Sequence, residues 1–546
     1  MTTLRQGLRC RLSLATLGAT VFIAAGAALN VFAATEGEHQ NGNSKHAPLL
    51  PAGMDTVVIA RVGNLDITAE EFLLSYEFGP AFVKKHGKPV ERYLDFMINE
   101  KLLALDGYAL GFAKDQEVAT MLTEIEGDLA TEELYRDDIL SQVVIDEKEL
   151  VQAIDKERIH LELKWLFAAG RADLAKYLAQ LSQGAPFDTL FQQQLNDSVQ
   201  IGNRSLATTR FRLEDSNPEM AQVVDTLSYG KVSPPIAAPD GFYLVKVTNK
   251  WTNAIMTQTE HAELKQAVLR ALRQRQADAL SDRYVNDLMR NQNPIINRRT
   301  FNILRALVGK TVLSPEKYQD WNLTGKLMSE AGPLDSLDME RYRNQTLVRL
   351  QNDNLLLGDF WTWYQARRAY IRFDSDSPQR FFASLKQMVW RSVRDKLLID
   401  RARQRGLQER LTVRRQKQWW EEKLVYARMK QEMLDAIRLT EEQAKHFYQQ
   451  KLRQYRDQTG MTLPYEKVTD QVRQDCYAEA LARNLFRAVN VLKNKYPVQV
   501  NRAALEALPI EAAPDLKAFD LITAKKGGTF PRPATPTIDF DWKLWE

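Results

Sequence analysis

An internal repeat constrains the fold of this chain more than any other feature of its sequence. Residues 58–72, VIARVGNLDITAEEF, align without gaps with residues 346–360, TLVRLQNDNLLLGDF, at an offset of 288. Each segment predicts a short hairpin that leads into a helix, and in the first copy Thr68 and Glu71 form a capping box at the start of that helix. The repeat therefore predicts two related lobes in one chain.

A second match follows at nearly the same spacing. Residues 99–112, NEKLLALDGYALGF, align with residues 394–407, RDKLLIDRARQRGL, and both segments contain Lys-Leu-Leu and a late glycine. Gly111 and Gly406 are predicted to end their helices, because glycine readily adopts the left-handed conformation that often follows a helix. Chance similarity between amphipathic helices is the alternative to a true repeat.

The offset then falls, which indicates an insertion in the first copy. Residues 145–150 match residues 439–444 at an offset of 294, whereas residues 296–298 (Ile-Asn-Arg) match residues 500–502 (Val-Asn-Arg) at an offset of 204. About ninety residues between positions 154 and 264 therefore have no counterpart in the second copy, which is enough for a small domain.

The insert has the pattern of a small α/β domain. Residues 161–167, LELKWLF, predict a first strand, and a helical pattern that Gly184 and Pro186 interrupt follows it. Residues 227–236 form a turn of the type L-x-x-G-x-V-S-x-P-I, and residues 241–247, GFYLVKV, alternate as a closing strand.

This turn and its closing strand resemble the parvulin-type (PpiC) peptidyl-prolyl isomerase domain. The resemblance implies a sheet flanked by helices and a site that rotates the peptide bond before proline. By spacing, the histidine, the cysteine or aspartate, the phenylalanine and the second histidine of active members correspond to Trp165, Asp197, Met220 and Tyr243. Only Asp197 has a residue type found in active members, and Trp165 cannot accept a hydrogen bond through its indole.

The resemblance thus implies a degenerate site. Asp197 is the remaining catalytic candidate, and Trp165, Met220, Leu227 and Tyr243 are predicted to bind peptide, because methionine and aromatic side chains make an adaptable apolar surface. Three alternatives stay open: these side chains only pack the core of the domain, they bind peptide without efficient catalysis, or they retain some isomerase activity.

The helical segments around the insert resemble the SurA, PrsA and PpiD group of exported foldases. That resemblance implies a mainly α multi-domain fold, with two SurA-like helical chaperone lobes and one small α/β parvulin-like domain inserted in the first. The predicted boundaries are 1–34 (signal peptide or anchor), 35–56 (linker), 57–158 (first lobe), 159–250 (parvulin-like domain), 251–300 (C-terminal helix and strand of the first copy), 301–344 (connector), 345–505 (second lobe without a parvulin domain) and 506–546 (C-terminal tail).

The first residues predict export. Arginines at positions 5, 9 and 11 precede an apolar run over residues 12–32, and small residues follow it before a polar stretch. This order is typical of a secretory signal peptide, although the run is also about long enough for an uncleaved anchor. The expected location is the periplasm or another extracytoplasmic compartment. If the run is not cleaved, residues 12–33 would anchor the protein in the inner membrane.

The composition argues against several classes of function. The 74 Lys and Arg residues nearly balance the 70 Asp and Glu residues, so there is no basic field for nucleic acid, and the basic helix face over residues 391–415 is interpreted as solvated. Two cysteines, Cys10 and Cys476, and six scattered histidines give no metal-ligand spacing. We therefore expect no nucleic acid partner, no metal and no cofactor.

Aromatic residues are frequent in the second copy. Trp361, Trp363, Tyr364 and Trp390 recur at helical spacing, which is typical of a core. The alternative is an apolar surface that binds unfolded clients, and these four residues are the candidates for it.

The chain ends in an alternating pattern. Ile538, Phe540, Trp542 and Leu544 are separated by polar or charged residues, which favours an edge strand. Such a strand would either pair with a sheet of this chain or add to a sheet of a partner.

Taken together, these features predict an exported chaperone that binds unfolded or proline-containing polypeptides of the envelope or the secretome without ATP. Burial of client side chains at ~25 cal/mol per Å² over many weak contacts would allow release without nucleotide. One alternative is an active peptidyl-prolyl cis-trans isomerase. The other is a dedicated assembly factor for a secretion or surface-polymer machine.

Overall fold

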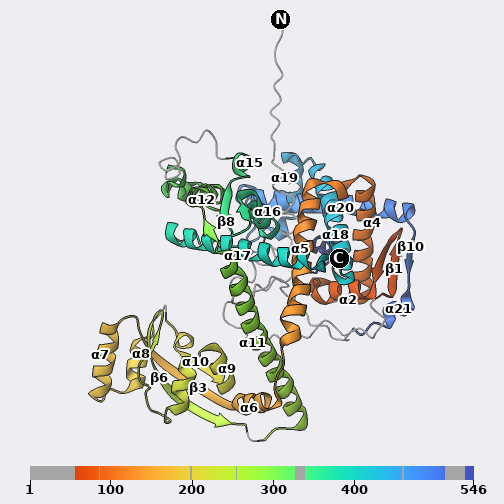
Figure 1. The fold of residues 1–546 in the computed structure, drawn as a ribbon. Coiled ribbons are helices and arrows are strands. Elements are labelled where there is room, and N and C mark those ends of the chain that lie inside the picture. The colour runs from red at the N-terminus through yellow and green to blue at the C-terminus, as the bar shows by residue number, and fades with distance from the viewer. Residues whose placement is uncertain are drawn as a thin grey trace. The chain divides into compact units, whose positions relative to one another are not determined.

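The fold was examined in a computed structural model, which describes residues 56–84, 87–196, 199–253, 255–325, 338–369, 371–457, 460–510 and 535–545 (Figure 1). These residues are mostly helical and form small antiparallel sheets, so the prediction of a mainly α multi-domain fold with a small α/β domain is confirmed. The predicted signal peptide or anchor lies outside the described residues, and so does Asp197. No helix in the described ranges is long and apolar enough to cross a membrane.

The chain divides into two compact units. Unit 1 contains residues 1–138 and 281–546, and unit 2 contains residues 139–280. Unit 2 is larger than the predicted parvulin-like domain at residues 159–250, because it includes the helices on either side of that segment.

Unit 1 begins with the first copy of the repeat. Gly63, at φ +58°, turns the first hairpin, and the Thr68 hydroxyl accepts the backbone N–H of Glu71 at 3.2 Å to start the helix that follows. The elements are β1 (Val58–Val62), β2 (Leu65–Thr68), α2 (Ala69–Phe78), α3 (Ala81–Lys84), α4 (Pro89–Ala109), η1 (Phe112–Lys114) and α5 (Gln116–Asp138).

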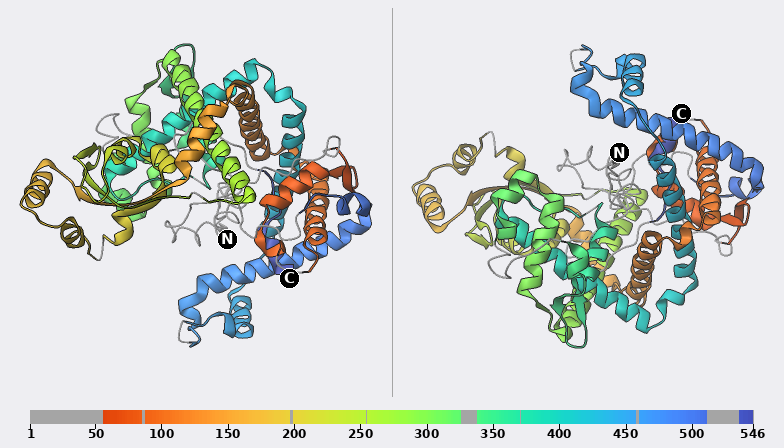
Figure 2. Two further views of the ribbon diagram at one scale, coloured as in Figure 1. Left: turned by 90° about the horizontal axis from the view of Figure 1, so that it is seen from below. Right: turned by 90° about the horizontal axis from the view of Figure 1, so that it is seen from above.

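The rest of unit 1 follows unit 2 in the sequence. It begins with β7 (Ile295–Ile296), the strand that ends the first copy, and continues with α12 (Arg298–Val312), α13 (Pro315–Asp320) and α15 (Met339–Tyr342). The second copy then starts with β8 (Thr346–Arg349), β9 (Asn354–Leu356), α16 (Leu357–Arg367), α17 (Pro378–Gln404) and η4 (Leu407–Glu409). The later elements are α18 (Leu411–Asp435), α19 (Glu441–Gln450), η5 (Leu452–Gln454), α20 (Tyr465–Lys495), β10 (Val498–Val500), α21 (Arg502–Glu506) and η6 (Phe540–Trp545). Helix α19 packs on the first half of α20 (Figure 2).

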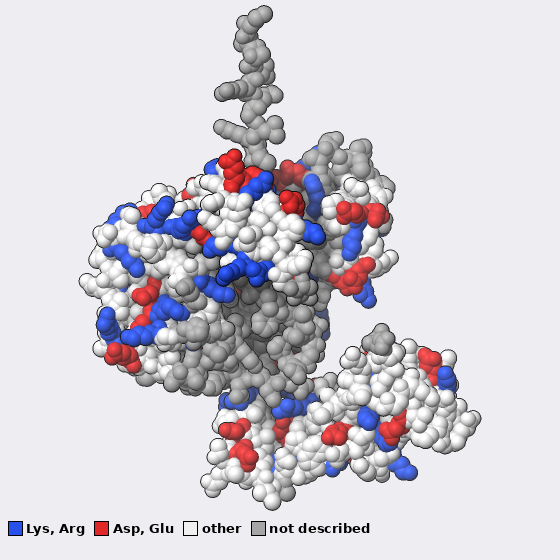
Figure 3. Space-filling model, turned by 180° about the vertical axis from the view of Figure 1, so that it is seen from behind, with Lys and Arg blue, Asp and Glu red and all other residues white. Residues whose placement is uncertain are grey.

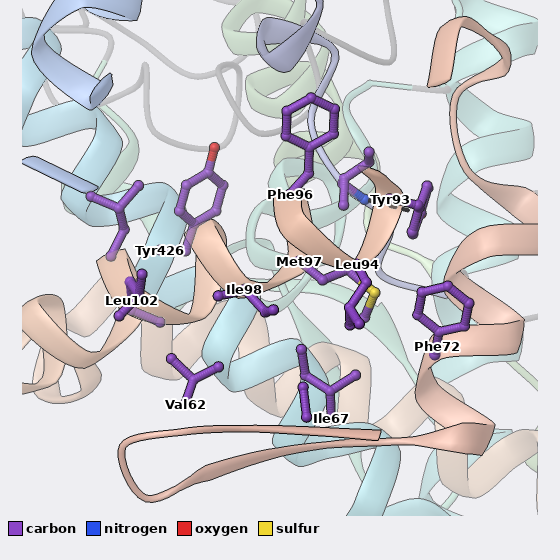
Figure 4. Packing of buried hydrophobic residues seen from close by; sticks show 14 of the residues in the cluster. Val62, Ile67, Phe72, Tyr93, Leu94, Phe96, Met97, Ile98, Leu102 and Tyr426 are labelled. Carbon is purple, nitrogen blue, oxygen red and sulfur yellow. Dashed lines mark hydrogen bonds between the residues drawn. The ribbon is translucent and has the colours of Figure 1, made fainter. Parts of the chain in front are cut away.

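The two copies together form one of the hydrophobic cores of unit 1. Residues from β1, β2, α2 and α4 pack with residues from α18 and α20, although the two sets are more than 300 positions apart. Figure 4 shows part of this cluster, with Tyr426 of α18 beside residues of α4 such as Leu102 and Ile98. This core is therefore formed by the first elements of the first copy and the last helices of the second copy.

The strands of the two copies are exchanged. One sheet has the order β10-β1-β2 and another has the order β7-β8-β9, so each hairpin pairs with the short strand that ends the other copy. Asn501 donates its backbone N–H to the carbonyl of Ile59 at 2.7 Å, and Asn297 donates its own to the carbonyl of Leu347 at 2.8 Å. Ile59 and Leu347 are equivalent in the repeat, as are Asn297 and Asn501.

Unit 2 is built around a four-stranded antiparallel sheet in the order β4-β3-β6-β5. Its elements are η2 (Leu140–Gln142), α6 (Glu147–Glu157), β3 (Ile159–Ala168), α7 (Arg171–Ser182), α8 (Phe187–Gln193), η3 (Ile201–Asn203), β4 (Ser205–Thr209), α9 (Arg210–Ser216), α10 (Pro218–Thr226), β5 (Ile236–Ala238), β6 (Gly241–Thr252) and α11 (Gln258–Gln292), which continues into unit 1. Helices α9 and α10 cover one face of the sheet, and α7 and α8 cover the other.

The C-terminal segment differs from the expectation. Residues 540–545 form the 3₁₀ helix η6 and not an edge strand, so the strand prediction is wrong. The side chains of Ile538 and Trp542, two of the alternating residues, are buried in the core of unit 1, whereas Phe540 and Leu544 are exposed. The segment can bury some of these side chains and expose the others without joining a sheet, because a 3₁₀ turn forms its backbone hydrogen bonds locally.

Candidate functional site

The candidate site lies on the face of the unit 2 sheet that α9 and α10 cover. On β3, Trp165 is paired with Val245 of β6, and Phe167 is paired with Tyr243. Because side chains alternate along a strand, Trp165 and Tyr243 project to the same side of the sheet as the buried Leu163 and Val245.

All four residues predicted to bind peptide meet in one apolar cluster. Met220 is buried in it, and Trp165, Leu227 and Tyr243 are half-buried against it. Helix α10 brings Met220 there, since Pro218 occupies its first turn and the Asn217 side chain accepts the Met220 backbone N–H at 2.9 Å. The cluster is apolar and partly exposed, as a seat for a proline ring must be.

The hydroxyl of Tyr243 is engaged within the domain. It donates to Asp240 Oδ2 at 2.6 Å, across the turn that precedes β6. Burial raises the pKa of Tyr243 to about 12, the Asp240 hydrogen bond and charge add to this effect, and Arg204 opposes it. The tyrosine is therefore a neutral hydrogen-bond donor over the whole physiological pH range.

Trp165, which is predicted to replace a histidine of active parvulins, contributes an apolar ring. Among the described residues, its buried Nε1 atom has no hydrogen-bond partner. Its backbone N–H donates to the carbonyl of Arg204 at 3.0 Å, which holds the start of β4 against β3. An indole has no acceptor nitrogen, so this side chain can neither exchange a proton with a neighbouring group nor orient that group by accepting a hydrogen bond from it.

Sequence reasoning did not find three residues that stand beside this cluster. The Arg204 guanidinium lies over the ring of Phe167, 5.0 Å from its centroid, and the Phe167 ring lies 5.3 Å from that of Tyr243. Asp240 completes the group through Tyr243. The dipeptide Asp240-Gly241 is a common turn sequence and could have located Asp240, whereas no sequence pattern singles out Arg204.

The aromatic residues proposed to bind clients lie in a core of unit 1. Trp363 and Tyr364 of α16 are buried, and Trp361 and Trp390 are half-buried and pack against the same cluster. The Trp363 indole donates to Asp395 Oδ2 at 2.9 Å. A client-binding role for the four residues stays a prediction, and for Trp363 and Tyr364 it would require this core to open.

The surface carries charges of both signs. On the face drawn in Figure 3, Lys and Arg side chains are interspersed with Asp and Glu side chains. Within the described ranges, no group of three or more His, Cys, Asp or Glu side chains is arranged to hold a metal ion.

The comparisons with known proteins place the site in a family. Residues 168–249 match the family model described as "Rotamase: PPIC-type PPIASE domain". A search of curated proteins found no match.

Solved structures of PrsA peptidyl-prolyl isomerases are similar to parts of the chain. That from Bacillus anthracis is 13% identical with a TM-score of 0.19 and covers 44% of this chain and 99% of its own. That from Bacillus cereus is 16% identical with a TM-score of 0.19 and covers 52% and 95%. That from Bacillus subtilis is 16% identical with a TM-score of 0.16 and covers 41% and 92%.

The family match covers all elements between β3 and β6, including the helix that carries Met220, and most of β6 itself, including Tyr243. Trp165, on β3, lies just before the matched residues. Unit 2 of this chain therefore contains a PPIC-type, or parvulin-type, peptidyl-prolyl isomerase domain.

Proposed function

We propose that this protein is an exported chaperone of the foldase type, which binds unfolded or proline-containing polypeptides without ATP and whose parvulin domain has weak or no isomerase activity. Residues 1–34 would direct export. The helical lobes of unit 1 would hold the client, and the apolar cluster of unit 2 would bind its proline-containing segments.

The observation that supports this proposal most is the composition of the parvulin site. Trp165 and Tyr243, the residues predicted to replace the histidines of active members, belong with Met220 and Leu227 to one partly exposed apolar cluster. Such a surface can bury a proline ring. The only side-chain hydroxyl of these four residues is already donated to Asp240, so little polar assistance is left for twisting the peptide bond.

The isomerase activity is tested with a protease-coupled assay on a proline-containing peptide. We expect a rate at least about a hundredfold below that of an active parvulin assayed in parallel, because positioned polar groups typically contribute that much to a rate. A rate within about threefold of the active parvulin, lost in an Asp197→Ala variant, would overturn the inactive assignment.

Peptide binding by the same cluster is tested separately. A fluorescent proline-containing peptide should bind the full chain, and Met220→Ala should weaken the binding by about tenfold, because truncating a central apolar contact typically has an effect of that size. Lys231→Ala, at an exposed position in the loop after α10, is the matched control and should bind as the parent does. Equal binding by parent and Met220→Ala would remove the cluster from the proposed function.

A further inference from the structure

The C-terminal segment, residues 535–545, lies in a groove of unit 1 in the manner of a bound peptide. Every neighbour described below belongs to α2, α4 or α18, more than 100 positions earlier in the chain. Trp542 is fully buried, with its ring stacked on Phe96 of α4 at 5.5 Å and facing Tyr426 of α18 at 6.5 Å. Figure 4 shows Phe96 and Tyr426 pointing away from the β1–β2 hairpin, toward the side that this segment occupies.

The groove recognises the segment through polar groups as well. Asp539 is paired with Lys423 at 2.8 Å and with Lys430, and it accepts the Tyr426 hydroxyl at 3.0 Å. Lys430 also binds Asp541 at 3.0 Å. The charge pattern is therefore two acidic side chains of the segment against two lysines of α18.

Glu100 of α4 accepts two further hydrogen bonds from the segment. Its Oε1 atom accepts both the indole N–H of Trp542 and the backbone N–H of Asp539, each at 2.8 Å. The Glu100 carboxylate thus recognises both the tryptophan indole and a backbone N–H three residues before it. Such convergent contacts are typical of a specific peptide site.

The repeat explains why the groove is available. In the second copy, Asp395 is the residue equivalent to Glu100, and it accepts an indole N–H from Trp363 of the same copy's α16. Continuing the 288-residue offset, the position in α2 that corresponds to Trp363 is Ser75. The first copy therefore has no indole at this position of its own α2, and Trp542 supplies one from the C-terminal segment.

Several charged groups of the groove have partners outside the segment. Lys423 is also paired with Glu100 at 2.7 Å, and Lys101 is paired with Glu71 at 2.7 Å and with Glu422. Buried ion pairs add little net stability over hydrated ones, so exposure of these groups to water costs less than exposure of an apolar core.

A cavity with both charged and apolar lining residues lies beneath the segment. This cavity of about 40 Å³, lined by Glu71, Ser75 and Lys101 on one side and by residues 536–538 on the other, exceeds the ~10–15 Å³ that a water molecule needs.

We propose that this groove is a binding site for acidic, aromatic polypeptide segments of the type apolar-Asp-x-x-Trp, and that residues 535–545 occupy it as a tethered ligand that a client segment of the same type displaces. The site is separate from the parvulin cluster. It gives unit 1 a preference for client segments with acidic and aromatic residues, whether or not they contain proline.

The first test uses a fluorescent peptide with the sequence of residues 535–546 and a chain truncated after residue 534. The truncated chain should bind the peptide, and peptides carrying Trp542→Ala or Asp539→Lys should bind at least about tenfold more weakly, since each loses a central contact. The full chain should bind the parent peptide at least about tenfold more weakly than the truncated chain, because the tethered segment competes at a high effective concentration. Lys430→Gln should weaken binding, whereas Lys467→Gln, at an exposed position on α20, is the matched control.

The second test uses the intact chain, so it is decisive even if the truncated chain does not fold. Hydrogen exchange of residues 538–545 should accelerate when unlabelled peptide is added in excess, while exchange in α4 and α18 stays unchanged. If the segment exchanges only together with α4 and α18 and is insensitive to the peptide, it is a fixed part of the fold and the proposal is wrong. A folded truncated chain that does not bind the peptide would overturn it as well.

Discussion

The backbone N–H of Asn501 donates to the carbonyl of Ile59 at 2.7 Å, so the strand that ends the second copy completes the sheet that begins the first. The reverse pairing, between β7 and β8, makes the exchange reciprocal. In each copy, the final strand thus pairs with the hairpin of the other copy. The same kind of exchange between two protomers is called domain swapping.

This exchange predicts that unit 1 survives a break between the copies. A protease site introduced within residues 326–337 should, after cleavage, leave fragments that elute together in gel filtration under native conditions. Each fragment supplies a strand to the other, and α18 and α20 of the second fragment complete the core of the first. Fragments that separate without denaturant would contradict the shared core.

The repeat could be predicted from the sequence, but the exchange could not. Equivalent hairpins and equivalent Val/Ile-Asn-Arg ends are visible as patterns, and Thr68, Gly111 and Gly406 adopt the predicted capping and left-handed conformations. Since either hairpin offers the same edge to either end strand, local pattern does not decide which pair forms. That choice depends on contacts across some 440 positions, such as Ala60 with Val500.

Asp539 should make the stability of the chain depend on pH. Burial alone would raise its pKa, but Lys423 and Lys430 outweigh burial and hold the pKa of Asp539 well below its ordinary value. The stabilisation is therefore fully present above the unfolded pKa of about 4 and is lost as the pH falls below it. Asp539→Asn should lower the free energy of unfolding by about 3 kcal/mol at neutral pH, because it leaves Lys430 poorly compensated.

This prediction is checked by urea unfolding of the parent and the variant at pH 7 and near pH 3. The difference between the two proteins should shrink at the lower pH. Asp541→Asn is the matched control: its carboxylate is about a third exposed, so the expected loss is below about 1 kcal/mol. A difference for Asp539→Asn that is the same at both pH values would rule out the assigned pairing.

The candidate site was predictable only in part. The spacing of a known family located Trp165, Met220, Leu227 and Tyr243, and the structure brings them into one cluster. The groove for residues 535–545 could not be predicted, because its lysines and Glu100 are ordinary helix residues until a segment from the far end of the chain meets them. The alternating pattern of that segment predicts a strand, but only Ile538 and Trp542 of the four alternating residues are buried.

Gly241 should be essential for the stability of the parvulin domain. It has φ +150°, and a Cβ atom there would lie 2.4 Å from the carbonyl oxygen of Ala168. We expect Gly241→Ala to lower the free energy of unfolding of unit 2 by about 2 kcal/mol, through backbone strain and displacement of β3. Gly170→Ala, where a Cβ would meet nothing within 4 Å, is the control. Thermal unfolding of the two variants gives the comparison, and equal midpoints would contradict the assigned strain.

The proposal that the helical lobes hold the client can be tested directly by removing the parvulin domain. Ile159 and Thr252 are paired at the base of the sheet, so a short Gly-Ser linker can replace the residues between them and leave α6 and α11 connected. The measurement is suppression of aggregation of an unfolded model protein, without nucleotide, by the full chain and by this deletion, with circular dichroism to verify that the deletion is helical. We predict equal protection by both proteins, and a folded deletion that gives no protection would contradict the account.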